Sequence, residues 1–241
     1  MKVVSLVTRR DGMSRKAFRD YYETHHAALS VQYFPFEKYV RNHLADAGEI
    51  GFDCIMECWI DHQKALGILT GKVERIFAED ERKFMQRRAR GVEVEEILVT
   101  GQPRDLDSPN LCKEILIVQN ASGAGGKELS DSLMQWGRAL AADAGGKCLR
   151  MTIDRVTGMK SDLLDGDALL TAWLSTDEAV LRRAAPPPDI KILAAVLSRP
   201  YETAQPQLAK ASVQAADISR PDCDCRFLRP RGWGPRDVEL I

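Results

Sequence analysis

The sequence predicts an α+β protein built from two ferredoxin-like β-α-β-β-α-β repeats that pack sheet to sheet within one chain. Three observations lead to this prediction. Short apolar, β-branched runs alternate with longer helical stretches, this order occurs twice, and a segment rich in proline and polar residues separates the two copies. A four-stranded sheet with helices on one face leaves its other face apolar, so packing two such sheets together covers both.

The first repeat is expected over residues 1–100. Apolar runs predict strands at 2–9, 37–44, 52–60 and 92–99. A first helix is expected to begin after Ser14, a suitable N-cap, and to reach about Val31. A second helix is expected from Asp61 to about Arg88.

The second repeat is expected over residues 112–200, as a degenerate copy that follows a linker at 101–111. Strands are predicted at 113–119, 147–156, 167–175 and 190–199, a helix at 127–143 and a short helix after Asp177. Residues 201–241 lie outside both repeats. Their prolines predict an extension that wraps over the protein rather than a helix.

Composition restricts the possible partners. The 241 residues carry a formal net charge of −1, which disfavours nucleic acid as a partner. We find no signal-peptide pattern and no apolar run long enough to span a bilayer, so we expect a cytoplasmic protein without a membrane partner. The six cysteines are interpreted as small buried residues rather than metal ligands; a metal site at Cys223 and Cys225 is the weaker alternative.

The first helix carries an unusual set of polar aromatic residues. Tyr22 and His26 follow Phe18 at helical spacing, so the three share one face. Tyr21 and His25 form a neighbouring stripe. This pattern favours a functional cluster; the alternative is that one histidine packs in the core and the other is solvated.

The second strand places Tyr39, Arg41 and His43 on one face. A phenol, a guanidinium and an imidazole in line could bind and protonate a carboxylate or an enolate. The alternative is an exposed polar face with the opposite face in the core.

The third strand places Asp53, Glu57 and Trp59 on one face. A carboxylate in apolar surroundings has a raised pKa and could serve as an acid or base. The alternative is that Glu57 is a structural partner of Arg9 or Arg41. Because all four histidines precede residue 63, any chemistry is expected in the first repeat.

Several of these motifs resemble the EthD family. The matching segments are Arg9-Arg10-Asp11-Gly12-Met13-Ser14, Phe18, Tyr22, His26-Ala27-Ala28-Leu29, Tyr39-Val40-Arg41-Asn42-His43, Phe52-Asp53, Glu57-Cys58-Trp59, Asp80-Glu81 and Phe84. The resemblance covers roughly residues 2–100 and implies a dimeric α+β barrel, formed here by the two repeats of one chain, with a homodimer as a further possibility.

The resemblance also implies proton transfer on a resonance-stabilised anion without a metal or organic cofactor. We therefore expect an isomerase or hydrolase of aromatic catabolism, of the lignin type, acting on a small unsaturated carboxylate such as a ring-cleavage dienoate, or on a phenolic substrate. The residues expected to be catalytic are His26, His43, Tyr22, Tyr39 and Glu57, and those expected to bind substrate are His25, Arg41, Asp53, Trp59 and Arg9.

Three other functions are compatible with the same residues. A polyketide cyclase or dehydratase would use them on a larger phenolic substrate. A non-catalytic binding protein would only hold the ligand. A haem-binding relative would need an axial ligand in an open cavity.

Overall fold

The computed structural model describes residues 1–45, 50–61, 68, 71–88, 91–102, 111–123, 126–157 and 165–208. Its elements are β1 (Lys2–Arg9), α1 (Arg15–Tyr21), the π-helical turn η1 (Tyr22–His26), α2 (Ala27–Tyr33), β2 (Phe36–Leu44), β3 (Cys54–Ile60), α4 (Gly71–Phe84), β4 (Met85–Arg88), β5 (Val92–Gly101), β6 (Cys112–Asn120), α5 (Gly126–Asp143), β7 (Cys148–Val156), β8 (Ala168–Leu174), the 3₁₀ turn η2 (Leu181–Arg183) and β9 (Ile190–Glu202).

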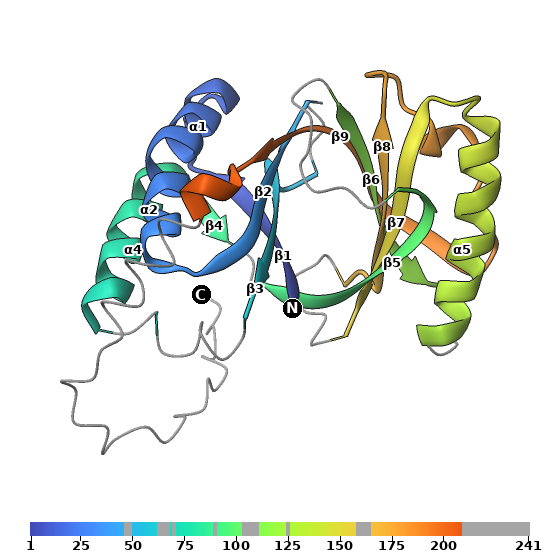
Figure 1. Ribbon diagram of the computed structural model, residues 1–241, viewed down its shortest axis with the longest axis horizontal. Coiled ribbons are helices and arrows are strands. Elements are labelled where there is room, and N and C mark those ends of the chain that lie inside the picture. Colours follow the sequence, from blue (N-terminus) through green and yellow to red (C-terminus); the bar gives the residue numbers. More distant parts are fainter. Residues whose placement is uncertain are drawn as a thin grey trace, which may run out of the picture.

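The strands form one closed antiparallel barrel. The order is β3-β2-β9-β6-β8-β7-β5-β1, and β1 pairs with β3 to close the ring, while β4 pairs with the last residues of β1, beyond those that pair with β5. The halves of the chain are joined twice, because β2 pairs with β9 and β5 pairs with β7. Figure 1 shows the ring between two groups of helices.

The predicted fold class is therefore wrong in its architecture. Two ferredoxin-like repeats packed sheet to sheet, as a dimeric α+β barrel within one chain, would bury two separate sheets against each other. The ladders between the halves instead make one continuous eight-stranded ring. Helices are few: the second half has one long helix, α5, and η2 stands where a second helix was expected.

Most expected elements occur close to their expected places. Ser14 caps α1 by accepting a hydrogen bond from the backbone N–H of Ala17 at 3.1 Å. The second helix is shorter than expected, because α4 ends at Phe84 and residues 85–88 pair with β1 as a strand. The expected part of this helix at 62–67 and 69–70 lies outside the described residues, as do most of the linker, at 103–110, and the tail from 209 to 241 with Cys223 and Cys225.

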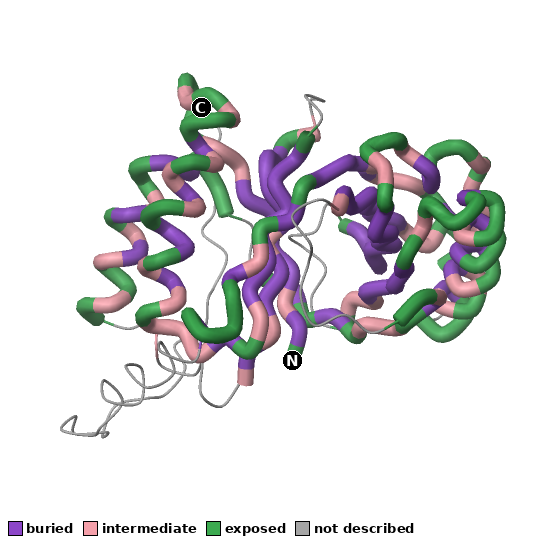
Figure 2. The backbone as a smooth tube through the Cα atoms, turned by 45° about the horizontal axis from the view of Figure 1, so that its top comes forward, coloured by how far each residue is buried: buried purple, intermediate pink, exposed green. Residues whose placement is uncertain are grey.

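Three apolar cores hold the barrel and its helices together. The largest packs α5 on the outer face of the second half, and another packs α1, η1 and α4 on the outer face of the first half. The third fills one part of the barrel interior, with Val4, Ile55 and Ile117 among its members. Figure 2 shows the strands at the centre as largely buried.

The rest of the barrel interior contains paired charges. Lys2 contacts Glu57 at 2.9 Å, Glu96 at 2.7 Å and Asp154 at 2.8 Å. Lys113 contacts Glu57 at 3.0 Å. These charges stay ionised out of water because each has opposite charges within hydrogen-bonding distance.

No helix in the described ranges is both long and apolar enough to cross a membrane.

Candidate functional site

The outer face of β2 brings together most of the residues predicted from the first helix and second strand. Tyr39, Arg41 and His43 point from β2 toward η1, which contributes Tyr22 and Glu23. We call these five residues the β2 cluster. All except Glu23 are at most 5% exposed, so the cluster lies under the helices rather than on the surface.

The local helix geometry explains how Tyr22 and Glu23 both reach β2. Residues 22–26 form a wider π-helical turn between α1 and α2. Such a turn changes the α-helical spacing on which the sequence analysis relied, and π-helical turns occur often at functional sites. Glu23 therefore joins the cluster although α-helical periodicity gave no reason to select it.

Glu23 holds two neighbours at once. Its carboxylate accepts hydrogen bonds from Arg41 at 2.5 Å from Nη2 and 3.2 Å from Nε, a bidentate arrangement. It also contacts His43 Nε2 at 2.7 Å. Burial would raise the pKa of Glu23, but the hydrogen bonds from His43 and Arg41 outweigh it and lower that pKa. Glu23 is thus an ionised acceptor.

These contacts determine the state of His43. Burial lowers the pKa of His43 below its ordinary value, against the raising effect of Glu23. The ring is therefore neutral at neutral pH, and because Glu23 can only accept, Nε2 carries the hydrogen. The lone pair is then on Nδ1, which is buried and has no hydrogen-bond partner. A buried imidazole with a free lone pair and a carboxylate on its other nitrogen is arranged as a general base.

Two tyrosines lie beside this base. Tyr39 donates a hydrogen bond to the hydroxyl of Tyr22 at 3.4 Å, and the Tyr22 ring lies edge-on to His43 with 5.6 Å between centroids. Burial raises the pKa of Tyr39 to about 12 and the pKa of Tyr22 well above its ordinary value. Both hydroxyls are therefore neutral donors at neutral pH, suited to stabilising an oxyanion.

His26 belongs to a separate hydrogen-bonded pair, although its ring lies 5.1 Å from that of Tyr22. Its Nδ1 lies 2.8 Å from Asp80 on α4, and Tyr21 donates to the same carboxylate at 2.7 Å. Burial would raise the pKa of Asp80, but these two hydrogen bonds lower it. The pair joins η1 to α4, and the aromatic ring of Phe84 lies 4.9 Å from that of His26.

Three predicted residues lie elsewhere. His25 is exposed, and its ring stacks on Tyr21 at 4.8 Å. Glu57 stands opposite Val4 in the β1–β3 ladder and so faces the barrel interior, where it pairs with lysines and not with a histidine, Arg9 or Arg41. Trp59 shares that face and lies 4.6 Å from the ammonium of Lys2. The proposed role of Glu57 in orienting a histidine is therefore wrong, because strand alternation separates it from the β2 cluster.

Arg9 and Asp53 lie at the end of β1, apart from the cluster. Asp53 accepts from the backbone N–H and the side chain of Arg9, both at 3.0 Å, and from Arg15 at 3.1 Å. The second half repeats this arrangement, since Asp167 accepts from the backbone N–H of Asn120 at 2.8 Å. Both halves thus have an aspartate that accepts from a backbone N–H at a strand end, and the expected substrate-binding role of Arg9 and Asp53 stays a prediction.

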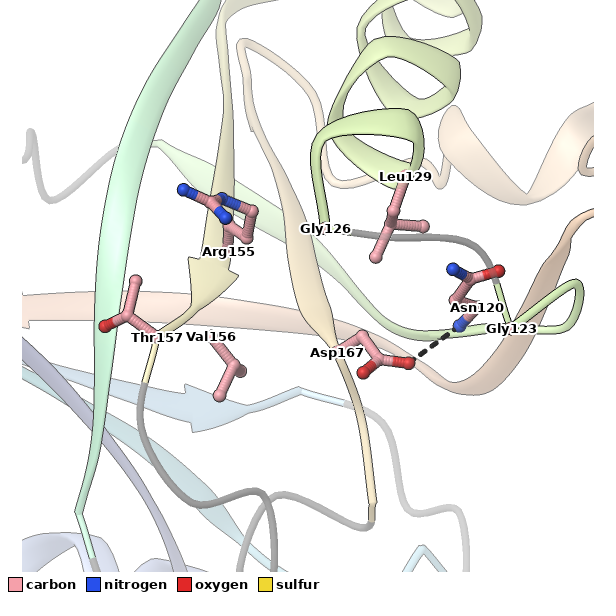
Figure 3. Close-up of a pocket in the computed structure, with 8 residues that line it drawn as sticks. All are labelled: Asn120, Gly123, Gly126, Leu129, Arg155, Val156, Thr157 and Asp167. Atoms are coloured by element: carbon pink, nitrogen blue, oxygen red, sulfur yellow. Dashed lines mark hydrogen bonds between the residues drawn. The ribbon is translucent and has the colours of Figure 1, made fainter.

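One cavity among the described residues lies in the second half (Figure 3). Its volume is about 460 Å³. The residues lining it are Asn120, Gly123, Gly126, Leu129, Arg155, Val156, Thr157 and Asp167. None of them is a histidine, cysteine, methionine or tyrosine.

This distribution of side chains does not fit a haem group. Haem iron takes an axial ligand such as histidine, cysteinate, methionine or tyrosinate from an open cavity, and the eight residues that line the cavity of Figure 3 include none of these. The His43 ring is enclosed by Phe18, Tyr22 and Tyr201 with centroids 5.4–5.9 Å away, and the His26 ring is enclosed in a similar way. Within the described residues, no group of three or more His, Cys, Asp or Glu could hold a metal ion.

Sequence reasoning missed three members of this region: Glu23, Asp80 as the partner of His26, and Thr203. Thr203 follows β9 and accepts a hydrogen bond from Arg41 Nη1 at 2.6 Å. Asp80 entered the sequence analysis only as part of the family resemblance, without a role at the site. The contact between Arg41 and Thr203 spans 162 residues, beyond any local pattern.

Comparisons with known proteins support the resemblance for part of the chain. Residues 10–88 match the family model of the EthD domain, and no curated protein matches the sequence. An anthrone oxidase-like protein has a similar structure, with 11% identity over 84% of this chain and 92% of its own, at a TM-score of 0.51. A proposed chlorite dismutase has 11% identity over 90% of this chain and 99% of its own, at a TM-score of 0.50. A proposed monooxygenase from Lactobacillus acidophilus has 10% identity over 85% of this chain and 95% of its own, at a TM-score of 0.46.

These names overturn the predicted function. The chain was expected to be a cofactor-independent isomerase or hydrolase of dienoates, but the two structures reported above with TM-scores of 0.50 and 0.51 are named for dismutase and oxidase chemistry. The alternatives of a polyketide cyclase or a binding protein gain no support from them. The family resemblance is confirmed where it is strongest: residues 10–88 match the EthD domain.

Proposed function

We propose that this chain is an oxidase that uses His43 to deprotonate an acidic aromatic substrate, which then reacts with O₂. The observation that carries the proposal is the buried Nδ1 of His43, which has no partner while Glu23 fixes the hydrogen on Nε2. Such a base can remove a proton from a phenol or from a carbon acid of the anthrone type.

The reaction balances with O₂ as the oxidant. Loss of a proton from the methylene carbon of an anthrone leaves a carbanion stabilised as a phenolate. Transfer of electrons to O₂ and formation of a carbon–oxygen bond give a peroxide anion, which takes the proton back from His43 and becomes a hydroperoxide at that carbon. Loss of water, which breaks the O–O bond and the remaining C–H bond, gives the quinone. In sum, anthrone and O₂ yield anthraquinone and H₂O.

The other members of the β2 cluster support this chemistry. Tyr22 accepts the hydrogen bond from Tyr39 and keeps its own hydrogen to donate to a phenolate oxygen. Arg41 lies 4.6 Å from the Tyr39 ring and supplies a positive charge beside the site. Phe18 and Tyr201 lie edge-on to His43, with centroids 5.9 Å and 5.4 Å away, and keep water from its ring.

The fold is compatible with this choice. Of the two structures with TM-scores of 0.50 or 0.51, one is named anthrone oxidase-like and the other a chlorite dismutase. The donor set described above does not fit haem, whereas a general base with neighbouring phenols fits the deprotonation of an aromatic carbon acid. Substrate identity, a cytoplasmic location and a homodimer stay predictions.

Oxygen uptake with a panel of anthrones and phenols tests the proposal. Wild-type protein should consume O₂ in step with quinone formation, and His43→Gln should lower the rate by about 100-fold. His25→Gln is the matched control: His25 is exposed, so this substitution should leave the rate unchanged. Uptake by His43→Gln at the wild-type rate, or no uptake with any substrate on the panel, would exclude this function.

A further inference from the structure

The end of β9 crosses from the second half onto the β2 cluster of the first half. β9 pairs with β2 up to Glu202, and the backbone N–H of Thr203 then donates to the carbonyl of Tyr39 at 3.0 Å. Tyr201 lies edge-on to His43, with 5.4 Å between centroids. Figure 1 shows this segment, in orange-red, beside α2.

The same segment is anchored in the first-half core. Leu208 is 2% exposed and packs in the core that contains Tyr22 and Phe36. Gln205 donates to the backbone carbonyl of Glu37 at 3.0 Å. Residues 203–208 are therefore fixed to the first half and stand in a defined position over Arg41.

We propose that Thr203 is a positioning residue that completes the site of the first half by fixing Arg41 against Glu23. This inference rests on the proposed function for its kinetic consequence. The contact itself concerns the geometry and charge of His43 whatever the substrate.

The hydrogen bonds of Arg41 show why Thr203 matters. The guanidinium is buried, and its donors are shared between Glu23 on one side and the Tyr39 carbonyl and Thr203 hydroxyl on the other. Removing the hydroxyl leaves a buried charged donor without one of its acceptors. Because an unsatisfied buried donor is unfavourable, the guanidinium should then turn away from Glu23 toward solvent or another acceptor.

Such a movement would change the titration of His43. The charged groups that face His43 are Glu23 from η1, Arg41 from β2 and Arg19 from α1; Tyr22 and Tyr201 face it with their aromatic rings. Glu23 raises the pKa of His43, and both arginines lower it. With Arg41 displaced, Glu23 is left to act on His43, so the pKa of His43 rises and the ring loses its neutral, basic form near neutral pH.

The test compares Thr203→Val, which keeps the shape but removes the hydroxyl, with Thr203→Ser, which keeps the hydroxyl. The pKa of His43 is measured by NMR titration of its ring carbons, assigned with His43→Gln. Thr203→Val should raise this pKa by about 1 unit, and Thr203→Ser should leave it at the wild-type value. Thr203→Ala provides a second hydroxyl-free variant if the valine variant does not fold.

The kinetic arm follows the same variants with a substrate that wild type oxidises. The acid limb of the pH–rate profile should move upward in Thr203→Val by as much as the NMR titration moves, with KM little changed. An unchanged pKa of His43 in the hydroxyl-free variants, or an equal shift in Thr203→Ser, would overturn the inference. A shifted pKa in a protein that oxidises none of the substrates would uphold Thr203 as a positioning residue and refute the oxidase function.

Discussion

Replacing Glu57 by glutamine should damage the stability of the barrel and not its chemistry. The carboxylate lies between two ammonium groups, 2.9 Å from Lys2 and 3.0 Å from Lys113, and also accepts from Asn42 at 2.5 Å. The positive charges beside Glu57 outweigh its burial and hold the pKa of this carboxyl well below its usual range. Glutamine keeps the shape and removes the charge.

The size of the effect follows from these distances. At an effective dielectric constant of about 20, each contact near 3 Å contributes about 5 kcal/mol of attraction, which desolvation largely offsets. Removing one partner leaves the desolvation of the lysines uncompensated, so Glu57→Gln should lower the free energy of unfolding by about 3–5 kcal/mol. The double variant Glu57→Leu/Lys113→Met removes one charge of each sign and should recover most of this loss.

Denaturant unfolding followed by circular dichroism measures the loss. Oxygen uptake per folded molecule, at a temperature where each variant is folded, measures the chemistry. A Glu57→Gln protein with wild-type stability and a rate lowered by about 100-fold would refute the reasoning and return Glu57 to the catalytic role that the sequence suggested.

Four further substitutions test the fold. Burial raises the pKa of Asp154 from 3.8 to about 6, so protonation of this carboxyl stabilises the folded state. This stabilisation is complete below pH 3.8 and is lost as the pH rises through 6. Asp154→Asn should therefore remove a pH dependence of about 3 kcal/mol or less from the free energy of unfolding over this window, measured by denaturant unfolding at several pH values. Gly101→Ala should cost more than about 2 kcal/mol in thermal unfolding, because its φ is 88° and a Cβ would lie 2.4 Å from a backbone oxygen. Gly12→Ala, at φ 75° with no atom near the added Cβ, should cost only about 1 kcal/mol. Equal costs for Gly12→Ala and Gly101→Ala would contradict the expected clash at Gly101. Leu208→Ala should cost about 2–5 kcal/mol, and no loss would mean that the end of β9 is not anchored.

Local periodicity predicted the parts of this protein that depend on neighbouring residues. The alternation in β2 placed Tyr39, Arg41 and His43 on one face, and the structure has them there under the helices. The capping residue Ser14 was identified because an N-cap interaction spans only three residues. By contrast, the alternation in β3 was interpreted correctly, but it could not say which face meets the helices, so Glu57 was assigned to the wrong environment.

The sequence by itself thus determined the order of the elements, the start of the first helix and the polar face of β2. Tertiary structure alone decided that the sheet closes into a ring, that Glu23 holds His43, and that Thr203 reaches Arg41 from the other end of the chain. The physical reason is that strand and helix periods are set by backbone geometry over a few residues. Ring closure and charge pairing join residues that are distant in sequence, and their partners are fixed only when the whole barrel packs.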